Sequence, residues 1–263
     1  MRWAMTEGEK NKRPLVSVVM PTYNCAEYIE DSINSVINQT FTDWELIIVD
    51  DCSTSNTMPA ILQKIKNIDK RISVYSTPIN SGPGIARNIG IAQAQGQYLA
   101  FLDSDDYWYP TKLEQQVVFM QTNHYALSCT HYEITNNQLH PFRMVSFPSC
   151  IPYRAMLWGY AVGTQGIMID RAQLTDIVFP ARSHAEDWQL WLRLLKQTDA
   201  IHVLPLVLWQ YRQTPCSINK RKVAIAKCVI EVYREEIPCS HVVAVLRLLF
   251  QYMPHLIVRK LLK

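Results

Sequence analysis

Three apolar runs in the first half of the chain each end in polar or acidic residues, and stretches with helical spacing separate them. The runs cover residues 16–20, 46–49 and 98–102, and the helical stretches cover residues 29–37, 61–68 and 85–91. Strands that alternate with helices form βαβ units, so with a further strand over 71–76 we predict a doubly wound, mostly parallel sheet flanked by helices. The carboxyl ends of such strands share one edge, where open α/β sheets bind their ligands.

The pattern becomes less regular after residue 110. We predict a helix over 111–122, strands over 127–134 and 166–169, a helix over 184–197, a strand over 200–211, and helices over 217–263 with pauses at Pro238 and Pro254. This mixed segment suggests an acceptor-facing half built onto the parallel core. Three parts are expected: a disordered leader over 1–14, a catalytic domain over 15–215 and a basic amphipathic helical tail over 216–263.

Charge is unevenly distributed along the chain. The net charge is +3, but residues from Cys216 onward carry nine Lys or Arg against three Glu. This tail is too short in its apolar stretches and too charged to span a bilayer, so it either lies on an anionic membrane surface or packs on the catalytic body or a homodimer partner. The polar and acidic residues at the strand ends would converge on one acidic crevice at the edge of the sheet. This acidic crevice argues against nucleic acid as a partner. Seven cysteines without a Cys-x-x-Cys pair or a signal peptide favour a cytoplasmic location, or one on the inner face of the cytoplasmic membrane.

Asp103 and Asp105 directly follow the apolar run that ends at residue 102. In extended backbone, residues i and i+2 point to the same side, so both carboxylates can face one cation. Mg²⁺ or Mn²⁺ held by one or two carboxylates and completed by phosphates is the usual arrangement for nucleotide substrates. The alternative is that these acids cap the next helix, but their place after an apolar strand, near two other polar strand ends, favours the cation.

Two other strand ends carry residues suited to a nucleotide. Asp50 and Asp51 suit hydrogen bonds to a ribose hydroxyl or a base N–H, or else residues 50–55 form a simple polar turn. The segment from Pro21 to Asn24 suits contact with a nucleobase edge, or else it is an ordinary loop in which Asn24 caps a helix. Spacing alone leaves both questions open.

Two further motifs lie on predicted helices. Arg87 follows the Gly-rich turn 81–84, and its planar guanidinium suits a diphosphate; the alternative is a surface arginine that bridges to the acidic crevice. Glu186 and Asp187 open the helix predicted at 184–197, next to Trp188. The helix dipole stabilises such acids without any function, which is the leading interpretation from physics alone, although a rigid helix also suits a general base.

Taken together, these segments resemble the family-2 glycosyltransferases, which have the GT-A fold. The resemblance covers residues 15–213 and rests on five motifs in the family's order: Val18-Val19-Met20-Pro21-Thr22-Tyr23-Asn24, Val49-Asp50-Asp51-Cys52-Ser53, Ala86-Arg87-Asn88-Ile89-Gly90, Phe101-Leu102-Asp103-Ser104-Asp105-Asp106 and Glu186-Asp187-Trp188. It implies an inverting, metal-dependent transfer of one hexosyl or N-acetylhexosaminyl group from a nucleotide-diphosphate sugar, by default a UDP-sugar. The implied acceptor is a hydroxyl of a glycan or a lipid-linked molecule in surface polysaccharide or lipopolysaccharide synthesis.

The resemblance also implies roles for individual residues. Asp187 would be the catalytic base, and Asp105 with Asp103 would hold Mn²⁺ or Mg²⁺. Thr22 and Tyr23 with Asp51 would hold the nucleobase, within a donor-binding set of Pro21, Thr22, Tyr23, Asn24, Asp50, Asp51, Arg87, Asp103, Ser104 and Arg212.

The chain departs from the family pattern in one place, because Thr214 stands where members often carry the histidine of an Arg-x-His element. The chain also has no Gln-x-x-Arg-Trp motif of the processive synthases, which favours transfer of one sugar per encounter. The alternative functions are a non-catalytic nucleotide-sugar binding module and an Asp-nucleophile phosphatase.

Overall fold

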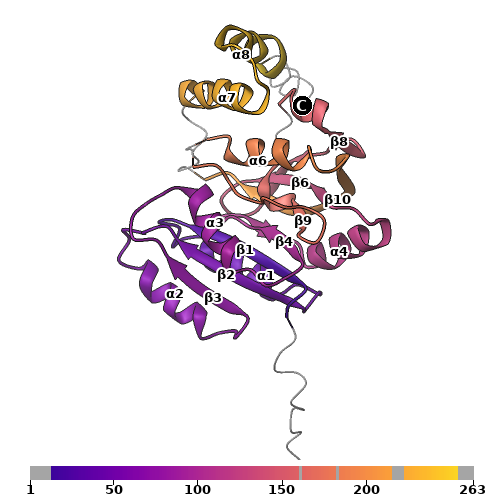
Figure 1. Cartoon of the computed structure of the whole chain (residues 1–263). Coiled ribbons are helices and arrows are strands. Elements are labelled where there is room, and N and C mark those ends of the chain that lie inside the picture. Colours follow the sequence, from indigo (N-terminus) through magenta and orange to yellow (C-terminus); the bar gives the residue numbers. More distant parts are fainter. Residues whose placement is uncertain (1–12, 160–161, 182–183, 215–221, 254–263) are drawn as a thin grey trace, which may run out of the picture.

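A ten-stranded sheet runs through the molecule in the order β3-β2-β1-β4-β9-β6-β10-β5, with β7 paired to β6 and β8 to β10 (Figure 1). The structure is a computed structural model and describes residues 13–159, 162–181, 184–214 and 222–253. Its strands are β1 (Val16–Thr22), β2 (Trp44–Asp50), β3 (Ile72–Ser76), β4 (Tyr98–Phe101), β5 (Tyr107–Trp108), β6 (Leu127–Thr135), β7 (Pro141–Val145), β8 (Cys150–Pro152), β9 (Met168–Asp170) and β10 (Ala200–Arg212).

The first hundred residues form the predicted doubly wound parallel half. Strands β3, β2, β1 and β4 pair in parallel and are connected by α1 (Ile29–Ile37), α2 (Met58–Lys66) and α3 (Pro83–Gln93). Successive β1 side chains point to opposite faces: Val18 packs in the cluster that contains residues of α1 and α2, whereas Val19 packs in the cluster that contains Ala86 of α3. Helices therefore cover both faces, and the predicted fold class is confirmed.

The second half is mixed, as expected. Strand β9 is antiparallel to both β4 and β6, while β10 runs parallel to β6. The helix predicted at 111–122 is α4 (Lys112–Asn123), and the strand predicted at 166–169 is divided between the 3₁₀ turn η2 (Thr164–Gly166) and β9. The helix predicted at 184–197 is shorter than expected, because α6 covers only Glu186–Leu194.

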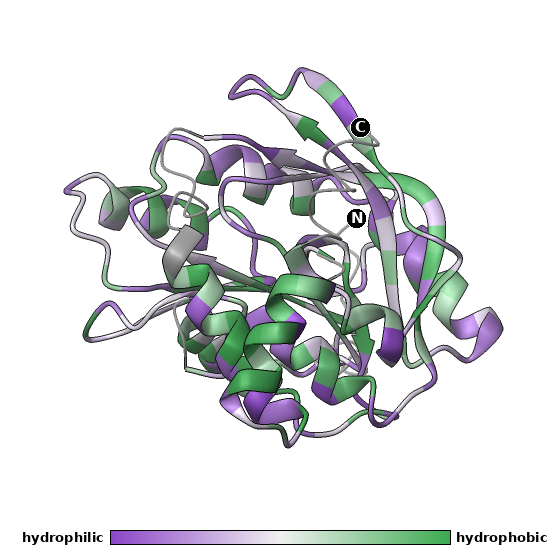
Figure 2. Cartoon of the chain, turned by 90° about the horizontal axis from the view of Figure 1, so that it is seen from above, coloured by the Kyte–Doolittle hydropathy of each residue, from purple (hydrophilic) through white to green (hydrophobic). Residues whose placement is uncertain are grey.

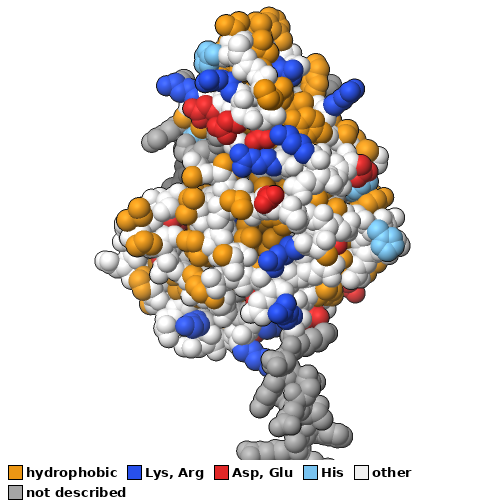
Figure 3. Space-filling model, viewed as in Figure 1, with side chains coloured by type: hydrophobic (Ala, Val, Ile, Leu, Met, Phe, Trp, Pro, Cys, Tyr) orange, Lys and Arg blue, Asp and Glu red, His pale blue; other side chains and the backbone are white. Residues whose placement is uncertain are grey.

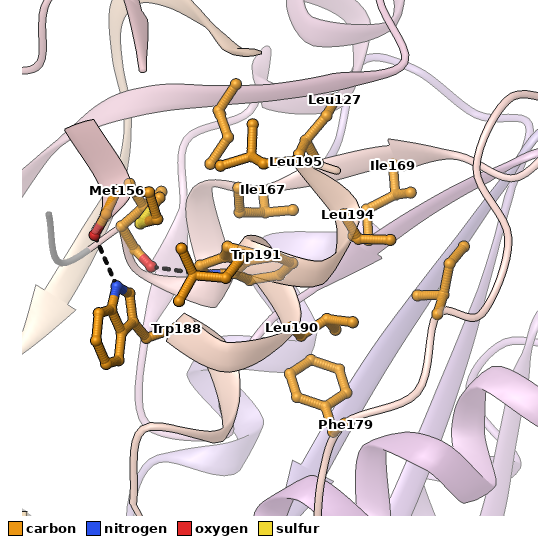
Figure 4. Packing of buried hydrophobic residues seen from close by; sticks show 14 of the residues in the cluster. Leu127, Met156, Ile167, Ile169, Phe179, Trp188, Leu190, Trp191, Leu194 and Leu195 are labelled. Carbon is orange, nitrogen blue, oxygen red and sulfur yellow. Dashed lines mark hydrogen bonds between the residues drawn. The ribbon is translucent and has the colours of Figure 1, made fainter. Parts of the chain in front are cut away.

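Helix α6 is fixed in place by its apolar face. Leu190, Trp191 and Leu194 are fully buried, and Figure 4 shows them among side chains from the sheet. The Trp188 Nε1 donates to the carbonyl of Met156, the last residue of α5 (Tyr153–Met156), at 2.9 Å. The Trp191 Nε1 donates to the Val162 carbonyl at 3.2 Å. The first turn of α6 therefore has a defined position relative to the sheet.

The C-terminal helices α7 (Lys222–Glu236) and α8 (His241–Arg247), followed by the π-helical turn η4 (Leu248–Tyr252), lie beyond α6 (Figure 1). The Trp188 ring meets the Tyr233 ring edge to face at 5.3 Å, and Val229 and Val232 belong to the same buried cluster as α6. The described part of the tail thus packs on the catalytic body, with a break at Pro238 as predicted.

Several predicted features lie outside the described residues. They are most of the leader over 1–14, the boundary at 215/216 and the pause at Pro254. Among the helices that the structure describes, none is both long enough and apolar enough to cross a membrane.

Candidate active site

The loops that follow β1 and β2 are joined at the carboxyl edge of the sheet. The Asn24 Oδ1 accepts hydrogen bonds from the backbone N–H groups of Thr54 and Ser55, at 2.8 and 3.0 Å. The Asn24 N–H donates to the Ser53 Oγ at 2.9 Å. Asn24 does not cap a helix, because the N-cap residue of α1 is Tyr28. Its side chain instead holds two loops together beside the expected nucleobase position.

Asp50 and Asp51 differ in their surroundings. Asp50 accepts a hydrogen bond from the Ser53 hydroxyl, so its carboxylate belongs to the polar turn that was the alternative interpretation. Asp51 is buried and accepts from the Thr77 hydroxyl at 2.9 Å and from the Gly82 N–H at 2.7 Å. Gly82 has a φ of +88°, which a residue with a Cβ rarely adopts. Asp51 thus orders the turn that leads into α3.

Thr22, Tyr23 and Pro21 lie beside this turn at the end of β1. The Asp51 N–H donates to the Thr22 carbonyl at 2.8 Å. The Thr22 Oγ1 is buried without a hydrogen-bond partner within the described chain, whereas the Tyr23 side chain is exposed. A buried hydroxyl without a partner is costly, so this position is suited to an incoming polar group such as a base edge.

The acidic motif after β4 forms a turn. Strand β4 ends at Phe101, and the Asp106 N–H donates to the Asp103 carbonyl at 3.1 Å. The expectation that an extended backbone aligns Asp103 with Asp105 is therefore wrong, because the chain reverses there. Ser104 is buried within the turn, and its carbonyl accepts from the Cys25 thiol at 3.3 Å.

Gln165, a residue that the sequence did not single out, organises this turn. Its Nε2 donates to the Asp103 Oδ2 at 2.7 Å and also to the Asp106 Oδ2 at 2.5 Å. Asp106 is fully buried and also accepts from the Arg212 N–H at 2.8 Å. Burial and the neighbouring acids raise the pKa of Asp106 well above its usual value.

Arg87 links the acidic turn to α6. Its Nη2 lies 2.7 Å from the Asp103 Oδ1, and its Nη1 lies 3.3 Å from the Glu186 Oε1. Arg87 is not the surface arginine of the alternative interpretation, because only 4% of it is exposed. Burial opposes its charge, but the two carboxylates outweigh burial and raise the pKa of Arg87. The arginine therefore stays charged and fixes Asp103 relative to the helix of Asp187.

Asp187 lies in the first turn of α6, where Ala185 as N-cap has a φ of +59°. The Asp187 Oδ1 accepts from the Trp188 N–H at 2.7 Å. Burial, with the nearby Glu186 charge, raises the pKa of Asp187 to about 7. A carboxylate with a pKa near neutrality is matched to proton transfer, as a general base requires.

Asp105 provides the second acid of the turn. Burial raises its pKa to about 6, and the Asp103 charge adds to that effect. Across the described ranges, no three or more His, Cys, Asp and Glu side chains are arranged to hold a metal by themselves. Two carboxylates that repel each other still fit Mg²⁺ or Mn²⁺, because these ions take one or two protein carboxylates and complete their shell with phosphate and water.

Arg212, a residue of the expected donor-binding set, has other partners. Its guanidinium lies over the Tyr28 ring at 4.7 Å, its Nη2 is 3.1 Å from the Asp31 Oδ2, and its Nη1 donates to the Asn137 carbonyl at 3.1 Å. The residue is 2% exposed. Thr214, two residues later, is half-buried.

Comparison with known proteins places these residues in a family. Residues 17–177 match the sequence profile described as "Glycosyl transferase family 2". The chain is 41% identical over 226 residues to "Putative teichuronic acid biosynthesis glycosyltransferase TuaG" of Bacillus subtilis (strain 168), covering 86% of this chain and 89% of that protein. It is 36% identical over 209 residues to "UDP-Glc:alpha-D-GlcNAc-diphosphoundecaprenol beta-1,3-glucosyltransferase WfgD" of Escherichia coli, covering 79% of this chain and 81% of that protein.

Solved structures show the same fold. The crystal structure of S. aureus TarS 1–349 in complex with UDP-GlcNAc matches with a TM-score of 0.71 at 24% identity, over 84% of this chain and 65% of that one. Mannosyltransferase PcManGT from Pyrobaculum calidifontis, in complex with GDP-Man and Mn²⁺, matches with a TM-score of 0.65 at 16% identity, over 87% and 66%. The fold is that of the GT-A glycosyltransferases, and with the match over residues 17–177 and the identity to its relatives, the chain belongs to glycosyl transferase family 2.

Proposed function

We propose that this glycosyltransferase catalyses inverting, metal-dependent transfer of one sugar from a UDP-sugar to a hydroxyl of a lipid-linked glycan acceptor. The observation that carries the proposal is the Asp187 carboxyl, whose pKa is raised to about 7 on a helix that Arg87 ties to the acidic turn. A base and a donor-binding acid cluster held by one ion-pair network are what a single displacement requires.

The donor lies, in this proposal, along the carboxyl edge of the parallel half. Thr22, Tyr23 and Asp51 contact the nucleobase, which suits the unpartnered Thr22 hydroxyl and the exposed Tyr23 ring. Pro21 and Asn24 shape the loop beside the base. Asp50 belongs to the turn after β2, and Arg87, Asp103 and Ser104 form the end of the proposed donor site at the acidic turn. Arg212 pairs with Asp31 and is left out of the proposed donor site. The choice of uridine is supported by the UDP in the name of WfgD and by the UDP-GlcNAc in the TarS complex.

Asp103 and Asp105 are the residues that would hold Mn²⁺ or Mg²⁺. When bound, such an ion supplies Lewis-acid stabilisation of the diphosphate leaving group. The Gln165 amide donates to the Asp103 Oδ2, and the Arg87 guanidinium donates to the Asp103 Oδ1. Together these two hydrogen bonds fix the orientation of the carboxylate that would bind the metal. The Mn²⁺ in the PcManGT structure supports the choice of metal.

Asp187 takes the proton from the acceptor hydroxyl as that oxygen attacks the anomeric carbon. The carbon–oxygen bond to the diphosphate breaks in the same displacement, so the configuration inverts and no covalent enzyme intermediate forms. Glu186 remains paired with Arg87, whose Nη1 lies 3.3 Å from the Glu186 Oε1.

The acceptor side of the proposal rests on the relatives. WfgD is named for a diphosphoundecaprenol acceptor, and TuaG for teichuronic acid biosynthesis. We place the reaction in surface polysaccharide synthesis, at the inner face of the cytoplasmic membrane.

The test measures UDP release from a panel of nucleotide sugars with Mn²⁺, in the presence of synthetic lipid-diphosphate-linked acceptors. Asp187→Asn and Asp105→Asn should abolish transfer, while Asp176→Asn, which changes an exposed aspartate, should leave it intact. Tight donor binding without turnover on any acceptor would contradict the proposal in favour of a binding module. Release of orthophosphate from the donor would contradict it in favour of a phosphatase.

A further inference from the structure

Asn88 on α3 holds the backbone of Phe179 through two hydrogen bonds. The Asn88 Nδ2 donates to the Phe179 carbonyl, and the Phe179 N–H donates to the Asn88 Oδ1, each at 2.8 Å. A side-chain amide that uses its donor and its acceptor on one backbone residue imitates a hydrogen-bonded pair of antiparallel strands. The segment around Phe179, 91 positions further along the chain, is therefore fixed against α3.

The Phe179 ring lies between three parts of the candidate active site. It is 1% exposed and meets the Phe101 ring, at the end of β4, edge to face at a centroid distance of 5.4 Å. The Arg87 guanidinium lies over the Phe179 ring at 5.2 Å. Trp191 of α6 meets the same ring at 6.1 Å, and Figure 4 shows these two side chains beside each other. The ring thus contacts the strand before the acidic turn, the buried arginine and the helix of Asp187.

The first turn of α3 lies very close to the same segment. A Cβ at Gly84 would lie 3.2 Å from the Pro180 carbonyl oxygen and 3.4 Å from the Glu186 Cγ. The first of these distances is tighter than an ordinary van der Waals contact, so a side chain here would push its neighbours outward. Glycine at this position therefore lets α3 approach both residue 180 and the first turn of α6.

The tail holds α6 on another side, where the contact does not depend on Asn88. The Trp188 ring of α6 meets the Tyr233 ring of α7 at 5.3 Å, and Ala244 and Leu248 belong to the same buried cluster. The other apolar side of α8 and η4 points outward, with Phe250 70% exposed. Figure 3 shows hydrophobic side chains at this end of the molecule, and Figure 2 shows hydrophobic residues on the helices seen from above. Helix α6 should therefore stay folded on the body when the Asn88 hydrogen bonds are removed.

We infer that Asn88 is a positioning residue of the proposed transferase, which holds the Phe179 ring in place and so fixes the helix of the base relative to the acidic turn. The inference rests on the proposed function, because this distance matters for catalysis only if Asp187 takes the proton. The acceptor oxygen must reach Asp187 and the anomeric carbon of the donor at the same time. A misplacement of about 1 Å in such an arrangement can cost about 10²-fold in rate.

The first experiment measures UDP release with Mn²⁺ and a short-chain lipid-diphosphate-linked acceptor, using the nucleotide sugar that the wild type accepts. Asn88→Leu removes both hydrogen bonds to Phe179 and keeps a side chain of similar size. Its kcat should fall by about tenfold to 10²-fold, while KM for the nucleotide sugar stays within about threefold of the wild type. Gly84→Ala presses on the same segment from the start of α3 and should also lower kcat more than it changes KM.

Asn123→Leu is the matched control. The Asn123 Nδ2 also donates to a phenylalanine carbonyl at 2.8 Å, that of Phe119, but on the exposed side of α4. This variant should keep the kcat and KM of the wild type. All rates are measured at a temperature at which thermal melts show each variant to be folded, so that a loss of kcat does not reflect unfolding.

Hydrogen exchange tests the Asn88 contact without any chemistry. The Phe179 amide should exchange at least about tenfold faster in Asn88→Leu than in the wild type, because its acceptor is lost. Amides of β1 and β2 should exchange alike in both proteins.

A folded Asn88→Leu variant with the wild-type kcat would overturn the inference, and so would a rise in KM without a fall in kcat. Unchanged exchange of the Phe179 amide would overturn it as well. A wild type that transfers no sugar but shows the expected difference in exchange supports the contact between Asn88 and Phe179 and refutes only the proposed chemistry.

Discussion

Replacement of Asp187 by Asn should make the protein more stable and nearly inactive, with a gain that depends on pH. Burial raises the pKa of Asp187 from 3.8 to about 7, a difference of about 3 pKa units. At about 1.4 kcal/mol per pKa unit, ionising this carboxyl in the folded protein costs about 4 kcal/mol. Asn keeps the acceptor for the Trp188 N–H and carries no charge, so the variant avoids the cost.

The sign of the pH dependence follows from proton binding. A raised pKa means that the folded state binds more protons than the unfolded state between pH 3.8 and about 7, so wild-type stability falls as pH rises through this range. The stability difference between Asp187→Asn and the wild type should therefore grow by about 2 kcal/mol or more from about pH 5 to about pH 8.5. At about 2 to 4 °C per kcal/mol, the full effect corresponds to a Tm increase on the order of 10 °C.

Two assays check this prediction. Thermal melts of both proteins across the pH range give the stability difference, and UDP release gives kcat/KM, which should rise with pH through about 7 in the wild type and fall by about 10² to 10⁴ in the variant. Asp176→Asn is the control and should show no pH-dependent gain. A stability difference that stays flat with pH, or a variant that keeps most of its turnover, would refute the reasoning.

Three further substitutions test the network and the core. Gln165→Leu removes the amide that donates to Asp103, so we expect a loss of about 2 kcal/mol in the free energy of unfolding and reduced turnover, measured by urea titration and UDP release. Arg87→Met leaves the Asp103 and Glu186 carboxylates without their shared cation and should cost about 3 kcal/mol; urea titration that finds no loss would contradict the assigned ion pairs. Lys112→Met removes a buried amine that has no hydrogen-bond partner within the described chain, and burial lowers the pKa of Lys112 well below its usual value. The free energy of unfolding of the variant should exceed that of the wild type by about 1 kcal/mol or more at about pH 7. This difference should become smaller at higher pH, because the folded wild type binds fewer protons than its unfolded state and so gains stability as the pH rises.

The parallel half of the fold was predictable because its signals are local. The apolar runs before Asp51 and Asp103 are long enough to cross a buried sheet, and the helices between them carry their apolar residues at helical spacing. Parallel connection then dictates that both acids lie at the same edge. The conformation of the acidic turn was not predicted, because distant residues help to hold it: the Gln165 amide donates to Asp103 and Asp106, and the Arg212 N–H donates to Asp106.

The contacts that organise the candidate site join residues far apart in the chain. Gln165 donates to carboxylates 62 and 59 positions away, and Arg87 reaches Glu186 across 99 positions. No local sequence pattern predicts these contacts of Gln165, because they depend on how β9 and η2 lie beside β4 in the folded sheet. The tail shows the same limit: amphipathic spacing indicated helices, but packing against Trp188 decided which face is covered.

Hydrophobic periodicity and motif order are properties of neighbouring residues. They were therefore enough to predict the alternation of strands and helices, the family, and the positions of Asp51, Asp103 and Asp187 at element ends. Three other features emerged from the packed structure alone: the pKa of Asp187 near neutrality, the burial of Arg87 between two acids, and the outward direction of the apolar side of α8. Desolvation, ion pairing and exposure depend on which distant segments cover a side chain, and the packing of the elements settles which segments those are.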